Sequence, residues 1–358
     1  MRSLLKNTKN LLPAIASSLL SGRTLNAASY GILVHFAGLK SAKAIAMPLY
    51  AQIEPTINCN LACSMCPVSL RKGAYSHDDL SLGDFKKIVD KIPSALHIQI
   101  QGWGEPLLNR DIIGMISYCK SKGIRATMVT NGQLLTHEMG LRILDSGLDA
   151  IGISVDGASK KTYERLRPGA SFERLLSNVK LLVKNRKWSK SKMKIFLMVV
   201  MMKENIYELS GIVELASELG VDGLRCQHVQ FKPGGTEANV SRSLFFGDNL
   251  EAAKVEIRRA SELARKRRLD CFVQKLEKSG NLACHWPWAG IYVSHDGRVE
   301  PCCNIVGLSL GSISHDDLQK IYNSEEYKKF RAGHASGSLP AQCKNCTYAY
   351  YNGEMVVL

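Results

Sequence analysis

The stretch Ile57-Asn-Cys-Asn-Leu-Ala-Cys-Ser-Met-Cys-Pro67 places Cys59, Cys63 and Cys66 in a C-x3-C-x2-C array. Three thiols this close in sequence cannot all pair as disulfides with one another, but all three can ligate one iron–sulfur cube. A [4Fe–4S] cube is normally held by four cysteines, one on each iron. Three cysteines therefore leave one iron open to a small molecule. A zinc knuckle or a set of buried free thiols is the alternative.

Length and composition describe an ordinary globular chain. Its 358 residues allow one large or two medium domains, and 45% apolar residues are enough for a sizeable core. Eleven cysteines are more than packing requires. Because no cleavable secretory signal is present, we expect a cytoplasmic protein whose clustered cysteines are metal ligands rather than disulfides. Oxygen-sensitive clusters of this kind also require a reducing compartment.

The formal net charge is +15, and part of this excess is local. Residues 1 to 53 contain six basic residues and no acidic residue. The other basic residues are scattered and do not alternate with aromatic residues as in a nucleic-acid-binding surface. We therefore expect an anionic small molecule, a lipid headgroup or a membrane surface as partner, and no nucleic acid.

Residues 1–50 form a separate basic, amphipathic, helical arm in this prediction. Leucine and isoleucine residues recur at helical spacing from Leu4 to Leu20, and Pro13 would interrupt the helix. The following apolar patch, Tyr30 to Leu39, is shorter than the roughly 20 residues that span a bilayer. Such a segment fits an interfacial anchor, so the protein could be peripheral on the membrane. Helices packed on the catalytic domain, or an organellar transit peptide, are the alternatives.

Between residues 51 and 235, six short apolar runs alternate with helical patterns. This rhythm predicts a parallel sheet with right-handed crossovers, curled into a partial (β/α)6 barrel of the α/β class. The cysteine array follows the first run directly, at the edge where such barrels carry their chemistry. The expected strands are Ala51–Ile57, His97–Trp103, Arg125–Thr130, Ala150–Val155, Lys194–Met202 and Gly223–Val229. The expected helices are Leu82–Lys91, Asp111–Lys122, His137–Ser146, Phe172–Arg186 and Tyr207–Leu219.

The cysteine array and the ends of the later strands together resemble the radical S-adenosylmethionine (SAM) enzymes. The second run ends in Gly102-Trp-Gly-Glu-Pro106, which is similar to the family's Gly-Gly-Glu-Pro motif with Trp103 as a departure. A second departure is Met65, where many relatives carry an aromatic residue near the adenine. The resemblance implies SAM contacts at Met65, Gly102, Gly104, Glu105, Pro106, Thr130, Asn131, Ser154, Asp156 and Arg167. A surface position is the alternative for Arg167.

The resemblance also implies the chemistry. Cys59, Cys63 and Cys66 would hold a [4Fe–4S] cluster whose open iron binds SAM. One electron, from a reductant such as ferredoxin or flavodoxin, would cleave SAM to a 5′-deoxyadenosyl radical, which then abstracts hydrogen from the substrate. Glu105 would accept hydrogen bonds from the SAM amine, and Arg167 would pair with its carboxylate.

A second cysteine system follows a bridging segment at residues 236–283, which contains an expected helix at Asn249–Arg268. Asp296-Gly297 predicts a hairpin, and a helix is expected at Asp316–Ala332. Residues 284–350 resemble the SPASM or twitch domains, which hold auxiliary [4Fe–4S] clusters. The resemblance implies one such cluster on Cys284, Cys302, Cys343 and Cys346. Spacing alone does not choose between Cys302 and Cys303, and a zinc ribbon is the alternative.

The expected activity is hydrogen abstraction from a small-molecule, sugar or lipid substrate, leading to oxidation or to formation of a carbon–carbon or carbon–sulfur bond. Peptide maturases of the family often carry a winged-helix module for the leader peptide, and residues 1–50 are too short and too helical for that. The alternative enzyme is a peptide-modifying maturase, of the ribosomal-peptide or sulfatase type. The alternative outside enzymes is a two-cluster electron carrier or redox sensor, which would not explain the strand-end motifs.

Overall fold

The computed structural model describes residues 41–44, 46–70, 78–230, 237–245, 250–274, 276, 284, 286–305, 308–344 and 346. Most of the helical arm expected at residues 1–50 lies outside these residues, as does part of the expected bridging segment. Among the residues described, no helix is both long enough and apolar enough to cross a membrane.

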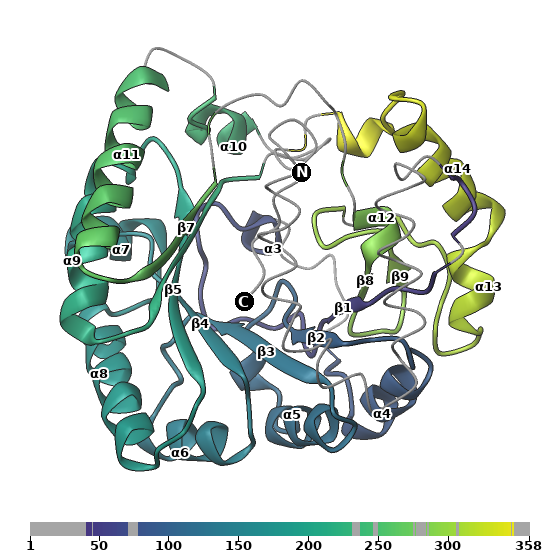
Figure 1. The fold of residues 1–358 in the computed structure, drawn as a ribbon, viewed down its shortest axis with the longest axis horizontal. Coiled ribbons are helices and arrows are strands. Elements are labelled where there is room, and N and C mark those ends of the chain that lie inside the picture. The colour runs from purple at the N-terminus through teal and green to yellow at the C-terminus, as the bar shows by residue number, and fades with distance from the viewer. Residues whose placement is uncertain are drawn as a thin grey trace.

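One nine-stranded sheet forms the centre of the protein, in the order β7-β6-β5-β4-β3-β2-β1-β8-β9 (Figure 1). The first six strands confirm the predicted partial barrel, and each pairs in parallel with the next. Because all six run the same way, their carboxyl ends lie at one edge of the sheet. These strands are β1 (Tyr50–Ile53), β2 (His97–Ile100), β3 (Arg125–Thr130), β4 (Ala150–Ser154), β5 (Lys194–Met201) and β6 (Gly223–His228).

Three further strands extend this sheet at its two ends. Within the bridging segment, β7 (Asp270–Val273) pairs in parallel with β6, and sequence analysis did not predict it. The predicted hairpin is present as β8 (Gly290–Val293) and β9 (Val299–Glu300), with Gly297 in its turn at a φ of +83°. Strand β8 pairs in parallel with β1, so the C-terminal region continues the barrel sheet.

Helices cover the outer face of the sheet (Figure 1). Side-chain oxygens of Ser81, Thr136 and Ser171 cap the first turns of three of the predicted helices, and left-handed Gly220 ends a fourth. The predicted helices are α4 (Leu82–Asp90), α5 (Ile112–Ser121), α6 (His137–Asp145), α8 (Phe172–Trp188), α9 (Leu209–Leu219) and α11 (Leu250–Lys266). Shorter helices are α3 (Pro67–Leu70), η1 (Pro106–Leu108), α7 (Lys160–Leu166), η2 (Ile206–Glu208), α10 (Glu237–Arg242), α12 (Trp286–Ala289) and η3 (Ala341–Cys343).

The single helix expected at Asp316–Ala332 is two helices, α13 (Leu318–Tyr322) and α14 (Glu325–Ala335). Ser324 caps α14 by accepting from the Tyr327 N–H, while the Asn323 side chain bonds both to the N–H and to the carbonyl of Ala44. These side-chain bonds compete with a continuous helix at this point.

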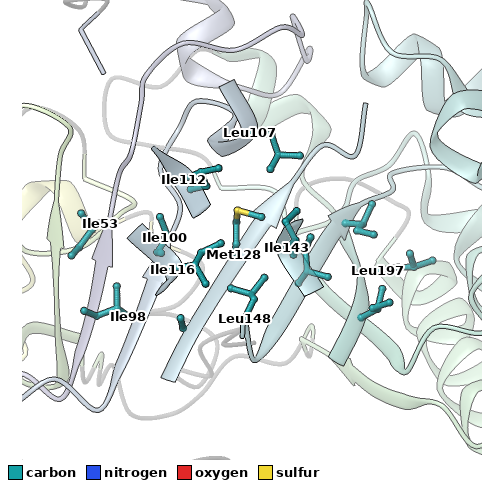
Figure 2. Packing of buried hydrophobic residues seen from close by; sticks show 14 of the residues in the cluster. Ile53, Ile98, Ile100, Leu107, Ile112, Ile116, Met128, Ile143, Leu148 and Leu197 are labelled. Atoms are coloured by element: carbon teal, nitrogen blue, oxygen red, sulfur yellow. The ribbon is translucent and has the colours of Figure 1, made fainter. Parts of the chain in front are cut away.

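The core lies between the sheet and its helices. Ile98, Ile100 and Met128 on β2 and β3 pack with Ile112 and Ile116 of α5, and all five are at most 1% exposed (Figure 2). Burying each such side chain contributes about 1.5–3 kcal/mol. This packing fixes the positions of the strand ends that carry the predicted site.

Candidate active site

The three predicted cysteines meet at the carboxyl end of β1. Cys59 is exposed, Cys66 is half-buried and Cys63 is buried. Their thiols are close enough that a negative charge on Cys63 or Cys66 raises the pKa of Cys59. The loop is held against the end of α7, because the Ala62 and Ser64 N–H groups donate to backbone carbonyls of residues 168 and 166.

Without a bound cation the Cys59 and Cys63 thiols hold their protons firmly. Burial raises the pKa of Cys59 to about 11 and also raises the pKa of Cys63. Thiolate, rather than thiol, ligates iron, so a strong positive centre is needed to ionise Cys59 and Cys63. Within the described residues no three such side chains converge closely enough to hold a single metal ion. A [4Fe–4S] cube spaces its thiolates more widely, because each one binds a different iron.

The buried carboxylate of Glu105 connects the ends of β2 and β3 through hydrogen bonds. Its Oε1 accepts from Thr130 Oγ1 at 2.6 Å and from the Leu107 N–H at 3.1 Å, and its Oε2 accepts from the Asn131 N–H at 2.7 Å. Its own N–H donates to the Asn58 carbonyl beside the cysteine array, at 2.8 Å. A carboxylate has about four acceptor positions, so one on Oε2 remains for a further donor.

Gly104 lets the Gly102–Pro106 turn approach the cysteine loop closely. A methyl group on this residue would lie 2.5 Å from the carbonyl oxygen of Asn58 and 2.7 Å from the carbonyl carbon of Ile57. Real side chains do not tolerate such contacts, so this position requires glycine. The glycine-rich turn and the cysteine array are thus one packed unit.

Asp156 and Arg167 form a buried ion pair beside the cysteines. Arg167 Nη2 and Nε lie 2.7 Å and 2.8 Å from Asp156 Oδ2, and Oδ1 accepts from the Val200 N–H. Arg167 is 8% exposed, so the alternative of a surface arginine is wrong. Its Nη1 lies 3.8 Å from Cys63 Sγ, where its charge lowers the pKa of that thiol against the larger effect of burial.

The remaining predicted SAM contacts surround the same site. Met65 is buried in an apolar cluster with Leu61, Met202 and Val229, next to Cys63. Ser154 is the last residue of β4 and is half-buried. Pro106 begins η1 directly after Glu105. The structure therefore brings the predicted residues to one edge of the sheet.

Glu54, at the end of β1, is a residue of this site that sequence analysis missed. It is 2% exposed, and its Oε1 accepts from the Trp103 N–H at 2.8 Å. Its Oε2 lies 2.9 Å from Nδ1 of His295, in the hairpin turn after β8. Gly102 has no room for a side chain because Glu54 packs against it. The only sequence signal was an acidic residue inside the expected strand Ala51–Ile57, just before the cysteine array.

The C-terminal cysteines also gather in one place. Cys284, Cys302 and Cys346 border an apolar cluster that contains Cys343, together with Ile305, Phe330 and Leu339. Burial raises the pKa of Cys284 to about 12 and that of Cys302 well above its usual value. Charges on the four other cysteines of the group, Cys303 included, raise the pKa of Cys302 further. Five thiols therefore share this region, and four would close the coordination of one cube.

Comparison with protein-family models agrees with both halves of this description. The radical SAM superfamily model matches residues 53–216, and the SPASM iron–sulfur cluster-binding domain model matches residues 284–347. A PqqA peptide cyclase from Bradyrhizobium diazoefficiens is 23% identical over 320 residues, covering 86% of this chain and 81% of the relative. An AdoMet-dependent heme synthase from Methanosarcina barkeri is 27% identical over 323 residues, covering 82% and 87%.

Solved structures show the same fold. Streptococcus suis SuiB bound to S-adenosylmethionine superposes with a TM-score of 0.67 and 18% identity, covering 85% of this chain and 72% of that chain. Native anSMEcpe with bound AdoMet superposes with a TM-score of 0.60 at 17% identity, covering 79% of this chain and 82% of that chain. The family implies a [4Fe–4S] cluster and SAM at the barrel, and auxiliary iron–sulfur chemistry at the C-terminal domain. The chain is thus a radical SAM enzyme, a member of the radical SAM superfamily with a C-terminal SPASM domain.

Proposed function

We propose that this enzyme modifies a peptide substrate. The observation that supports this most is the likeness to a PqqA peptide cyclase across both the barrel and the C-terminal region. This reverses the preference of the sequence analysis for a small molecule, sugar or lipid. That preference rested on residues 1–50, which do not resemble a leader-peptide module. The similarity to the peptide cyclase covers 86% of the chain, so it extends far beyond those residues.

In this proposal Cys59, Cys63 and Cys66 hold the barrel cluster. When bound, the cluster and SAM together supply a carbon radical that removes hydrogen from the substrate. The protein supplies position: Glu105 keeps one acceptor on Oε2 free, and Gly104 holds its turn against the cysteine loop. Arg167 supplies a fixed positive charge next to Cys63, which favours the ionised thiolate that ligation requires.

The auxiliary cluster would be held by Cys284, Cys302, Cys343 and Cys346. Four cysteines occupy all four irons, so this cluster has no position left for SAM. When bound, it would supply an acceptor for the second electron of a two-electron oxidation of the peptide.

A tetrapyrrole is the second candidate substrate. The specific observation in its favour is the AdoMet-dependent heme synthase, whose 27% identity exceeds that of the peptide cyclase over a similar length.

Anaerobic assays of the reconstituted enzyme separate these candidates. With SAM and a strong reductant we expect 5′-deoxyadenosine, and none from the variant in which Cys59, Cys63 and Cys66 are all alanine. Candidate peptides encoded beside the gene are then added, with an iron porphyrin in parallel. Faster SAM cleavage together with a mass change in a peptide supports the proposal. A modified porphyrin with unchanged peptides would replace it by the second candidate.

A further inference from the structure

A long acid-free stretch lies in the barrel, far from the cysteine array in sequence. Residues 174 to 203 contain no aspartate or glutamate but nine basic residues. Trp188, the last residue of α8, lies within this stretch, and its exposed fraction of 81% is the largest among the large apolar side chains in the described part of the chain. The nine are Arg174, Lys180, Lys184, Arg186, Lys187, Lys190, Lys192, Lys194 and Lys203.

The charges nearest Trp188 are mostly uncompensated. Asp222 pairs with Arg186 and Lys194. Four other lysines near Trp188 in sequence are exposed, namely Lys184, Lys187, Lys190 and Lys192. None of the four forms an ion pair with a residue that the structure describes. This end of α8 therefore presents an aromatic side chain within a positive field.

A second basic run lies at the same edge of the sheet. All four residues of Arg265–Arg268, at the end of α11, are exposed. In the sheet, β6 lies between β5 and β7. Backbone hydrogen bonds join the starts of the three strands: the Asp222 N–H donates to the Ile195 carbonyl, and the Asp270 N–H donates to the Asp222 carbonyl. The two runs thus precede strands two positions apart, about 10 Å in the sheet. Helices α8, α9 and α11 lie along one side of the molecule (Figure 1).

Backbone conformation marks both runs independently of charge. Lys190 and Arg268 have φ values of +55° and +57°, and they are the non-glycine residues with positive φ in the described chain. Other left-handed positions next to helix ends are occupied by glycine, as at Gly123, Gly147, Gly220 and Gly337. A side chain costs free energy in this conformation. At these two positions the chain keeps a basic side chain where glycine would be less strained.

We propose that this edge binds the surface of an anionic lipid membrane. We call it the basal surface: Trp188, the four exposed lysines around it, and Arg265–Arg268. Tryptophan partitions to the headgroup region, and lysine and arginine are attracted to anionic lipid. Strained residues of the observed kind are retained where a function needs them. Both features point to a negative, flat partner.

The position of the basal surface disfavours two other partners. It lies at the amino ends of the strands, whereas the cysteine array lies at the carboxyl ends. The eight residues of β5 span about 26 Å between these edges, too far for a reductant to deliver an electron directly to the barrel cluster. A single-stranded nucleic acid would need a row of exposed aromatic residues for stacking. The other exposed aromatic residue in the described part, Tyr207, follows β5 at the opposite edge.

Membrane binding in this orientation turns the site away from the lipid. The substrate then reaches the cysteine array from the aqueous side, which fits a peptide better than a lipid drawn from the bilayer. This consequence rests on the proposed function, but binding itself does not, and it is measured without substrate.

The sharpest test separates charge from strain in the full-length reconstituted protein. In the variant Lys190→Gly with Arg268→Gly, two charges are lost and two strained positions are relieved. We expect an equal or higher melting temperature, but weaker co-sedimentation with phosphatidylcholine vesicles containing about one third phosphatidylglycerol. Each basic residue contributes about fivefold to such partitioning, so binding should fall roughly tenfold or more. Trp188→Ala should also weaken binding.

Lys161→Gln with Lys320→Gln is the matched control. It removes two exposed charges from other surfaces and should leave binding within about twofold, since the field of a charge fades within a Debye length. The basic residues of the N-terminal arm are unchanged in every variant. The proposal is overturned if the glycine variant binds vesicles as the wild type does, if the control weakens binding equally, or if a short oligonucleotide binds and the vesicles do not.

Discussion

Glu54 on the first barrel strand and His295 in the C-terminal hairpin lie 2.9 Å apart, Oε2 to Nδ1, although 241 residues separate them. The second oxygen of Glu54 accepts from the backbone N–H of Trp103, inside the glycine-rich turn of the site. One buried carboxylate therefore joins the first strand, the predicted SAM-binding turn and the SPASM region. A disturbance in the C-terminal domain can reach the barrel site through this contact.

Replacing His295 by glutamine should destabilise the protein more at pH 6 than at pH 9. Burial lowers the pKa of His295, but its hydrogen bond to Glu54 and the Glu54 charge outweigh burial, with Asp296 adding to them and Arg298 opposing. The pKa of His295 is therefore raised in the folded protein. The charged pair stabilises the fold fully when the pH is below the pKa of an unfolded histidine, about 6.5, and this stabilisation is lost as the pH rises through the pKa of His295 in the folded protein.

At pH 6 the variant leaves Glu54 buried without its charged partner, which should cost about 3 kcal/mol in the free energy of unfolding. Chemical denaturation at the two pH values measures this. His315→Gln, at an exposed position, should change the free energy by less than about 0.5 kcal/mol. A His295→Gln cost that is equal at both pH values would show that the pair is not charged.

Gly104→Ala should weaken SAM binding at least tenfold and destabilise the protein by about 2 kcal/mol or more, because its methyl group meets the backbone of the cysteine loop. Isothermal titration of the reconstituted enzyme with SAM measures the first effect. Gly83→Ala is the control: it lies in α4, its methyl group would meet only Ser81 Oγ at 3.7 Å, and it should stabilise by about 0.5–1 kcal/mol. Equal SAM affinity in both variants would refute the packed arrangement.

Arg167→Met should be among the most destabilising single substitutions in the barrel. It leaves the Asp156 carboxylate buried at 0% exposure, with the Val200 N–H as its donor among the described residues, at a cost of about 3–5 kcal/mol. Asp156→Asn with Arg167→Met should recover part of that loss. Arg174→Met, at an exposed position, is the control and should change unfolding by less than about 0.5 kcal/mol. If Arg167→Met unfolds like the wild type, the pair contributes nothing to folding.

Sequence analysis predicted the features that are encoded by residues close together in the chain. The six strands were recognisable because each is a buried apolar run followed by a helical pattern, and the array from Cys59 to Cys66 is local. Strand β7 was not recognisable, because Asp270–Val273 is four residues long and follows a highly charged helix. The pairing of β8 with β1 and the Glu54–His295 contact depend on residues more than 200 positions apart. No local pattern encodes such contacts.

The surroundings of Cys302 and Cys303 differ in the structure, and the difference bears on which of them would ligate the auxiliary cluster. Cys302 borders the apolar cluster that holds Cys343, and charges on all four other C-terminal cysteines reach it. Cys303 is not among the residues packed on that cluster, although its charge raises the pKa of Cys302 and Cys284. It also acts on Tyr292, whose pKa is raised first by burial and then by Glu54. We therefore expect Cys302 to be the ligand and Cys303 to lie between the auxiliary cysteines and the Glu54 contact.

Cys302→Ala should lower the iron content from roughly eight to roughly four per chain, whereas Cys303→Ala should leave it near eight, because each [4Fe–4S] cube contributes four irons. Iron analysis and electron paramagnetic resonance of the reduced proteins distinguish the two. Cys302→Ala should still cleave SAM at the barrel but should form no product if the auxiliary cluster accepts the second electron. Loss of SAM cleavage together with an unfolded C-terminal region would indicate a structural role instead. Iron loss in Cys303→Ala, with full loading of Cys302→Ala, would reverse the assignment.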